Sequence, residues 1–223
     1  MKTQRFSRIE EAVGALADGR MVIVVDSEDR ENEGDLITAA ETITPQAIHF
    51  MISEGRGQLC MPLLPDIAQR LKLTPMVREP RDSLQPRFAV PIDHRQCATG
   101  ISPLERAFSI RSICDPNSRP EDFVRPGHIF PLIARPEGVL ARTGHTEAAV
   151  DLARMAGRTP AGVLCEVCSN DGMGMAERDE LFELSARFGL PIITIDALVE
   201  HRLRQAGDHE PRSASCAEPA VNC

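Results

Sequence analysis

Apolar runs of five to seven residues, each bounded by polar or turn-forming residues, recur along the chain. Runs of this length fit strands that are buried in a sheet. We therefore expect strands at 21–25, 36–40, 57–63, 88–92, 129–134, 162–168 and 191–195.

Helical patterns with recognisable ends lie between these runs. The first, 45–54, follows Thr44, an N-cap residue, and has proline at its first position. The second begins at Ser102, which is expected to form a capping box with Glu105, and continues to about residue 113. Two further helices are expected at about 146–157 and 177–188.

The order of these elements predicts a single domain. Strands and helices alternate without a linker rich in Pro, Gly and Ser, and without an internal repeat. We expect an α/β or α+β domain over residues 1–204. Residues 205–223 are polar and lack periodicity, so we expect a disordered tail there.

Charge and hydropathy exclude several classes of partner. The chain has 25 Lys and Arg against 33 Asp and Glu, a net charge of −8, and no basic block that could bind nucleic acid. The N-terminus lacks the apolar core of a signal peptide, and no segment approaches the ~18 apolar residues of a membrane span. We expect a cytoplasmic protein with neither a nucleic-acid nor a membrane partner.

The seven cysteines do not indicate a metal site. In a reducing compartment they should be thiols. Cys165 and Cys168 form a C-x-x-C, but it lies in an apolar run typical of a buried strand. Without a second pair of this kind, zinc or redox chemistry has little support.

Candidate chemistry begins with DSEDRENEGD, residues Asp26–Asp35, which we call the acidic loop. Most charge runs are solvated turns. Here the acids flank Gly34 between two expected strands, so their side chains should be held close together. Close carboxylates repel one another, which favours a divalent cation as partner. An EF-hand is rejected, because Ala40 occupies the position of its bidentate Glu.

A second candidate is ARTGHTEAAV, residues 141–150. Arg142 and the backbone N–H groups at the start of the following helix could converge on an anion, and phosphate fits best. The alternative is a simple helix cap by Thr146, which requires neither Arg142 nor His145. His145 could bind a metal or lie at the surface.

Two further residues leave alternatives open. Glu166 interrupts an apolar strand, so it is either paired at a site or faces water from a one-sided sheet. His128 lies in a Pro/Gly turn before a strand, where either a functional or a structural role is possible.

These segments occur together in one known family. The motifs DSEDRENEGDLITAAE, TGIS, RPGHIFPL, RTGHTEAAVDLARMAG and GVLCEV resemble those of the 3,4-dihydroxy-2-butanone 4-phosphate synthases of riboflavin biosynthesis, from about Phe6 to Arg204. The resemblance implies an α+β fold with a mixed sheet flanked by helices, and a homodimer with active sites near the subunit interface. It implies a lyase that converts D-ribulose 5-phosphate to L-3,4-dihydroxy-2-butanone 4-phosphate and formate, with two Mg²⁺ or Mn²⁺ ions.

The same resemblance implies roles for individual residues. Glu31 and His145 are expected to ligate the metals, and Glu33 to transfer a proton. His128 and Glu166 match residues regarded as essential for catalysis, and Cys60 matches an active-site cysteine. The expected substrate contacts are Arg30, Glu31, Asp35, Thr99, Arg142, Thr143, Gly144, His145, Thr146 and Glu166.

Departures from the family pattern leave other functions open. Glu105 replaces the usual Asp, and the loop 78–87 is unusually rich in Arg and Pro. No second enzymatic domain follows, so we expect a monofunctional form. The alternatives are a divergent paralogue acting on a related sugar phosphate, or a non-catalytic binding protein with the same fold.

Overall fold

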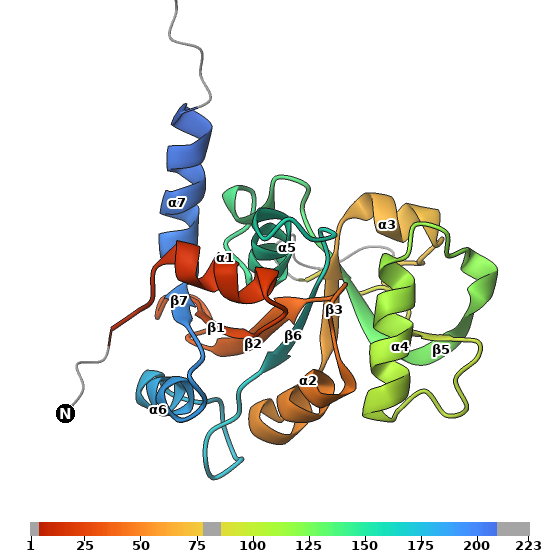
Figure 1. The fold of residues 1–223 in the computed structure, drawn as a ribbon, viewed down its shortest axis with the longest axis horizontal. Coiled ribbons are helices and arrows are strands. Elements are labelled where there is room, and N and C mark those ends of the chain that lie inside the picture. Colours follow the sequence, from red (N-terminus) through yellow and green to blue (C-terminus); the bar gives the residue numbers. More distant parts are fainter. Residues whose placement is uncertain (1–4, 78–85, 209–223) are drawn as a thin grey trace, which may run out of the picture.

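The apolar runs assemble into one mixed sheet. The computed structural model describes residues 5–77 and 86–208, and within them seven strands pair in the order β4-β5-β3-β6-β2-β1-β7 (Figure 1). β1 pairs with β7, and β3 with β5, in parallel, whereas the other neighbours are antiparallel. The strands are β1 (Val22–Val25), β2 (Gly34–Ala39), β3 (Cys60–Leu63), β4 (Ile92–His94), β5 (Phe123–Ile133), β6 (Gly162–Glu166) and β7 (Ile192–Thr194).

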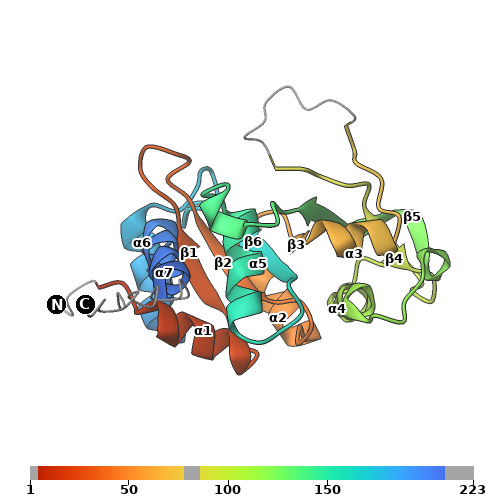
Figure 2. The ribbon, with the colours of Figure 1, turned by 90° about the horizontal axis from the view of Figure 1, so that it is seen from above.

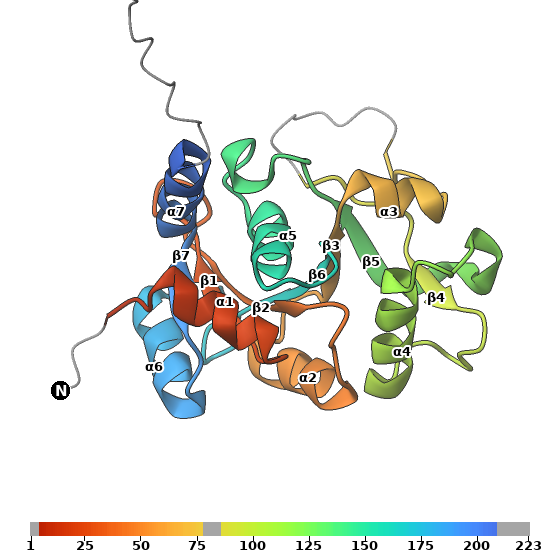
Figure 3. The same cartoon turned by 45° about the horizontal axis from the view of Figure 1, so that its top comes forward.

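Helices cover both faces of this sheet (Figures 1 and 3). Among the described residues, none is both long and apolar enough to cross a membrane. The α-helices are α1 (Ile9–Ala17), α2 (Pro45–Phe50), α3 (Pro65–Arg70), α4 (Pro103–Cys114), α5 (His145–Met155), α6 (Arg178–Phe188) and α7 (Ile195–Asp208). The shorter helical segments are η1 (Met51–Gly55), η2 (Pro120–Asp122) and η3 (Gly138–Leu140).

Alternation along the strands creates two cores. In β1, Ile23 and Val25 pack on one face with residues of α2, α4 and α6, while Val22 and Val24 pack on the other with α1, α5 and α7. Successive side chains of a strand point to opposite faces. Central strands between two helical layers must therefore be apolar throughout, which explains the unbroken apolar runs. The expected α+β class and mixed sheet are confirmed.

Most sequence predictions of elements hold, with informative exceptions. Of the run 88–92 only Ile92 belongs to a strand, because β4 begins there and Phe88 and Ala89 form isolated bridges. β5 begins at Phe123, well before the predicted residue 129. The helices α1, α3 and α7 were not predicted.

The predicted tail and the loop 78–87 fall at the edges of the described residues. Helix α7 continues to Asp208, four residues beyond the predicted boundary at 204, and residues 209–223 lie outside the described residues. The Arg/Pro-rich loop 78–87 also lies largely outside them, since only residues 86 and 87 are described.

The predicted helix starts are confirmed, with one change in detail. Thr44 Oγ1 accepts a hydrogen bond from the N–H of Ala47, and Ser102 Oγ accepts one from Glu105. Glu105 does not complete a capping box with the Ser102 N–H. Its carboxylate instead accepts N–H groups of the preceding turn, residues 98–100.

Candidate active site

The acidic loop is organised by its first residue. Asp26 directly follows β1 and is buried. Its Oδ1 accepts the N–H of Glu33 at 2.8 Å, and its Oδ2 accepts the N–H of Glu31 at 3.1 Å and Arg30 Nη1 at 2.8 Å. These bonds close the loop that projects from the end of β1 and β2 (Figure 2). Asp26 was not predicted as a site residue, although an acid directly after a buried strand is a signal visible in the sequence.

The loop meets the start of helix α5. His145, the first residue of α5, is buried, and its Nε2 lies 3.2 Å from the carbonyl oxygen of Val24 in β1. A carbonyl oxygen only accepts, so Nε2 carries the proton and Nδ1 keeps its lone pair. Asp26, Glu31 and His145 each offer a ligand atom within 4.8 Å of the others.

Arg142 lies beside the same helix start. Its Nη1 donates to Glu147 at 2.7 Å, and a Cβ on Gly144 would lie 2.1 Å from that nitrogen. Gly144 is the N-cap of α5 and provides no side-chain cap. The cap by Thr146 that the sequence left open is therefore not formed, and the first N–H groups of α5 have no capping side chain.

Glu166 approaches from the neighbouring strand. It pairs with Asp35 across β6 and β2, and its Oε2 accepts the N–H of Gln58 at 2.7 Å. A Cβ on Gly57 would lie 2.6 Å from that same Oε2, so the backbone passes against the carboxylate only because residue 57 is glycine. Glu166 is thus half-buried and held at the site.

These elements enclose a cavity of about 230 Å³, which we call the acidic pocket. Its lining combines four acids, two arginines, one histidine and several apolar side chains. Its lining residues are Arg30, Glu31, Glu33, Asp35, Cys60, Pro86, Phe88, Leu132, Arg142, His145, Thr146, Leu164 and Glu166.

Crowded acids shift the ionisation of the pocket. Burial, together with repulsion from Glu31 and Glu166, raises the pKa of Glu33. Burial also raises the pKa of Asp35 well above its usual value, and its Oδ1 is buried without a hydrogen-bond partner. By contrast, burial lowers the pKa of His145 to about 4, so the ring is neutral at neutral pH and able to bind a metal.

Burial likewise raises the pKa of the Cys60 thiol, which therefore stays protonated at neutral pH. Cys60 forms part of the pocket wall in this neutral form.

Two expected site residues lie in a separate group. His128 and Thr99 are not among the lining residues of the acidic pocket. His128 Nδ1 contacts Asp93, and Thr99 bonds to Glu105. We call Asp93, Thr99, Gly100, Glu105 and His128 the His128 cluster. Thr143 is exposed at the surface before α5 and is also not a lining residue.

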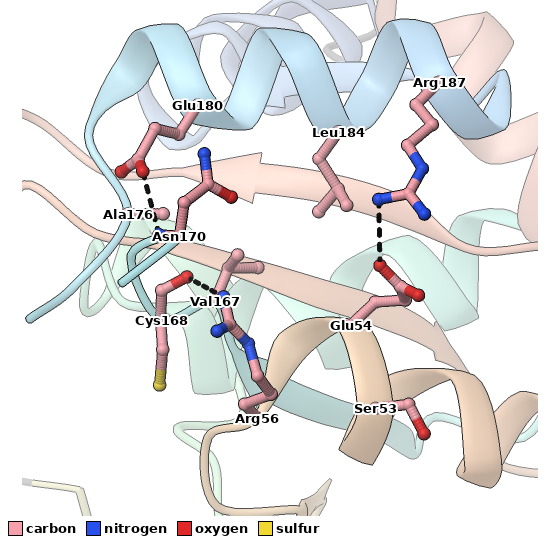
Figure 4. Close-up of a pocket in the computed structure, with 10 residues that line it drawn as sticks. All are labelled: Ser53, Glu54, Arg56, Val167, Cys168, Asn170, Ala176, Glu180, Leu184 and Arg187. Carbon is pink, nitrogen blue, oxygen red and sulfur yellow. Dashed lines mark hydrogen bonds and ion pairs between the residues drawn. The ribbon is translucent and has the colours of Figure 1, made fainter. Parts of the chain in front are cut away.

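A second cavity, of about 250 Å³, lies between η1, α6 and the segment after β6 (Figure 4). Its charged side chains have partners within the protein. Arg56 donates to the carbonyls of Cys168 and Ser169 at 2.8 Å, and Arg187 lies 3.6 Å from Glu54. This cavity therefore has the character of a packed structural junction. Cys168 borders this cavity, while Cys165 is buried.

Comparison with known proteins places this chain in one family. The family model for 3,4-dihydroxy-2-butanone 4-phosphate synthase matches residues 10–201. A riboflavin biosynthesis protein RibBA of Bacillus subtilis is 53% identical over 197 residues, which cover 88% of this chain and 49% of that protein. A 3,4-dihydroxy-2-butanone 4-phosphate synthase of Wolinella succinogenes is 49% identical over 198 residues, 89% of this chain and 57% of that one. The chain spans about half the length of these curated relatives.

Solved structures agree with the sequence comparison. A 3,4-dihydroxy-2-butanone 4-phosphate synthase in complex with two magnesium ions has a TM-score of 0.85 at 37% identity, covering 91% of this chain and 99% of that one. The two-domain synthase RibBX from A. baumannii has a TM-score of 0.85 at 44% identity, covering 88% and 58%. The chain belongs to the 3,4-dihydroxy-2-butanone 4-phosphate synthase family.

Proposed function

We propose that this chain converts D-ribulose 5-phosphate to L-3,4-dihydroxy-2-butanone 4-phosphate and formate in riboflavin biosynthesis. The observation that carries the proposal is the acidic pocket, where several carboxylates, one neutral imidazole and two guanidinium groups converge. Membership of the family and the names of the relatives support it. A cytoplasmic location remains a prediction of the sequence.

The first chemical step requires a base beside the ketone of the sugar, because a carbon-bound proton must be removed to form the enediol. Glu33 suits this role, since its raised pKa brings the carboxylate closer to the operating pH. Asp35 and Glu166 face each other across β2 and β6, and are proposed to hold the substrate hydroxyls. Several acid/base groups in one pocket match a reaction with repeated proton transfers.

A divalent cation fits the donor set of this pocket. Asp26 already accepts three hydrogen bonds, so Glu31 and His145 are the proposed ligands, with Nδ1 as the donor atom of His145. Two protein ligands are enough for Mg²⁺, because this ion usually retains several of its bound waters. Mn²⁺ accepts the same oxygen and nitrogen donors. The bound ion, or two as in the solved relative, would stabilise negative charge that develops on the substrate oxygens.

The phosphate is proposed to bind at the start of α5. Arg142 is held beside the pocket by Glu147, and the N-terminal N–H groups of α5 lack a capping side chain. Thr146 lines the pocket at this point, and Thr143 and Gly144 shape the turn before it. Arg30, held by Asp26, also lines the pocket and is proposed to contact the sugar.

We also propose a homodimer whose interface lies near the active sites. Three exposed apolar residues, Ile101, Leu104 and Val124, are next to members of the His128 cluster in sequence or in strand pairing. Val124 pairs with Asp93, and Ile101 follows Gly100. An interface here would cover these side chains and bring Thr99 and His128 into a protein-lined environment.

The main test is formate release from D-ribulose 5-phosphate. We expect Mg²⁺-dependent formate, abolished by EDTA and restored by added Mg²⁺. Glu33→Gln should lower kcat by about 10²–10⁴-fold, because the base is lost, without a change in fold by circular dichroism. Asp29→Asn, an exposed acid of the same loop, is the matched control and should retain activity. Absence of metal-dependent formate from the unaltered protein would refute the proposed function.

Arg142→Ala tests the phosphate site. Loss of a charged hydrogen bond of about 1.5–3 kcal/mol should raise KM on the order of 10-fold or more, with a smaller effect on kcat. Steady-state kinetics measure both constants. Arg204→Ala, on the exposed surface of α7, should change neither. An unaltered KM in Arg142→Ala would contradict the assignment.

Asp35→Asn tests how much the buried, ionised carboxylate of Asp35 lowers the stability of the folded protein. The folded-state pKa of Asp35 is raised by burial and by Glu166 and Glu33, whereas the unfolded value is about 3.9. The folded state thus binds the proton more tightly, and stability falls as the pH rises from about 4 through the folded-state pKa. Without metal, Asp35→Asn should therefore be more stable than the unaltered protein at pH 8 but not at pH 4.

Thermal unfolding in EDTA at both pH values measures this difference. A chain of this size gains about 2–4 °C in Tm per kcal/mol. Asp29→Asn should show no such pH-dependent gain. A lower Tm of Asp35→Asn at pH 8 would show that the carboxylate stabilises the fold.

The homodimer predicts a solution mass of about twice the 24.5 kDa of one chain. Leu104→Glu puts a charge on a side chain that is 66% exposed beside the His128 cluster, and should yield a monomer with lost activity. Leu203→Glu changes a 57% exposed side chain on α7 and should remain dimeric. Light scattering after size-exclusion chromatography measures the solution mass of each variant. If Leu104→Glu remains dimeric, the interface lies elsewhere.

A further inference from the structure

His128 is held in an irregular part of the sheet. β4 and β5 pair at Ile92↔Ile129 and then at Asp93↔Val124, so the segment 125–128 bulges out of the ladder. The bulge leaves the N–H of His128 without a strand partner. Asp93 Oδ1 accepts it at 2.9 Å.

The second oxygen of the same carboxylate reaches the imidazole. Asp93 Oδ2 lies 2.6 Å from His128 Nδ1. Asp93 is buried, whereas the His128 side chain is 41% exposed. The buried carboxylate of Asp93 therefore contacts both the backbone N–H and the ring of His128, while part of the His128 ring remains exposed to solvent.

The surroundings of Asp93 leave it little freedom. A Cβ on Gly127 would lie 2.3 Å from the Asp93 nitrogen, and one on Gly100 would lie 2.0 Å from Asp93 Oδ2. Gly100 also has a φ of +80°, which favours glycine. Gly127 thus packs against the backbone at Asp93 and Gly100 against its carboxylate, and together they hold Asp93 beside His128.

Glu105 holds the turn that covers Asp93. Its carboxylate accepts the N–H groups of Ala98, Thr99 and Gly100 and the hydroxyl of Thr99. These bonds anchor the turn, whose Gly100 lies against the Asp93 carboxylate, so Asp93 remains enclosed.

We propose that Asp93 is a positioning residue that sets the tautomer and orientation of His128 through this two-point contact. A carboxylate accepts from Nδ1–H, so Nδ1 carries the proton and the Nε2 lone pair points outward, available to a substrate proton. The proposal rests on the proposed function for its kinetic consequence only. The tautomer itself is a property of the folded protein.

The first test is the tautomer of His128 in the unaltered full-length protein. Two-dimensional ¹H–¹⁵N spectra of the imidazole nitrogens, assigned by loss of one spin system in His128→Ala, distinguish Nδ1–H from Nε2–H. We expect Nδ1–H. A neutral His128 ring protonated at Nε2 would overturn the proposal, whether or not the protein forms formate.

Asp93→Asn provides the second test. The asparagine amide can donate to Nδ1, which should shift the ring toward the Nε2–H tautomer and lower kcat about 100-fold with little change in KM. Asp115→Asn, an exposed aspartate after α4, is the control and should change neither tautomer nor kcat. If Asp93→Asn keeps both the Nδ1–H tautomer and the original kcat, the proposal is wrong.

A double variant separates positioning from general structural damage. If Asp93 acts through His128, adding Asp93→Asn to His128→Ala should cause no further loss of kcat. A full additional loss would overturn the proposal. If Asp93→Asn fails to fold, the tautomer of His128 in the unaltered protein still tests the proposal. If no formate forms in any variant, the proposed function fails while the tautomer result stands.

Discussion

The carboxylate of Asp26 is the contact on which the acidic loop depends. It accepts the N–H groups of Glu31 and Glu33 and the guanidinium of Arg30, so that three residues with proposed roles take their positions from one buried side chain. Asn32 between them adopts a φ of 53°, a conformation that asparagine tolerates better than most residues. Because β1 and β2 hold both ends of the loop and Asp26 bonds within it, Glu31, Glu33 and Asp35 line the same pocket as residues of β6 and α5.

Much of the fold could be predicted because the sheet is buried on both faces. Residues 22–25, 36–39 and 162–166 form central strands, and their apolar runs are unbroken for that reason. Prediction failed at the edge, where β4 and β5 are irregular and Phe88 and Ala89 make only isolated bridges. Local pattern cannot reveal a register shift, because it depends on which residues of a distant strand are opposite.

The same distinction applies to the site. The acidic loop and the start of α5 were visible in the sequence because each is a local motif, and the structure brings Glu31 and His145 together as the resemblance implied. Asp93 was not singled out, because its significance comes entirely from His128, thirty-five positions away. Glu166 remained ambiguous until Gln58 and Asp35 were seen beside it, since burial and pairing are properties of the assembled sheet.

The two groups of site residues differ in how their carboxylates are satisfied. Asp93 is buried with two hydrogen-bonding partners, so its charge is compensated within the protein and serves to hold a ring. Asp35 is buried with one oxygen unpartnered and further acids nearby, so its charge is not compensated by the protein. A pocket with uncompensated negative charge favours ligands that carry positive charge or hydrogen-bond donors. The electrostatic cost is an argument for the proposed cation and substrate hydroxyls, because they would supply positive charge and hydrogen-bond donors.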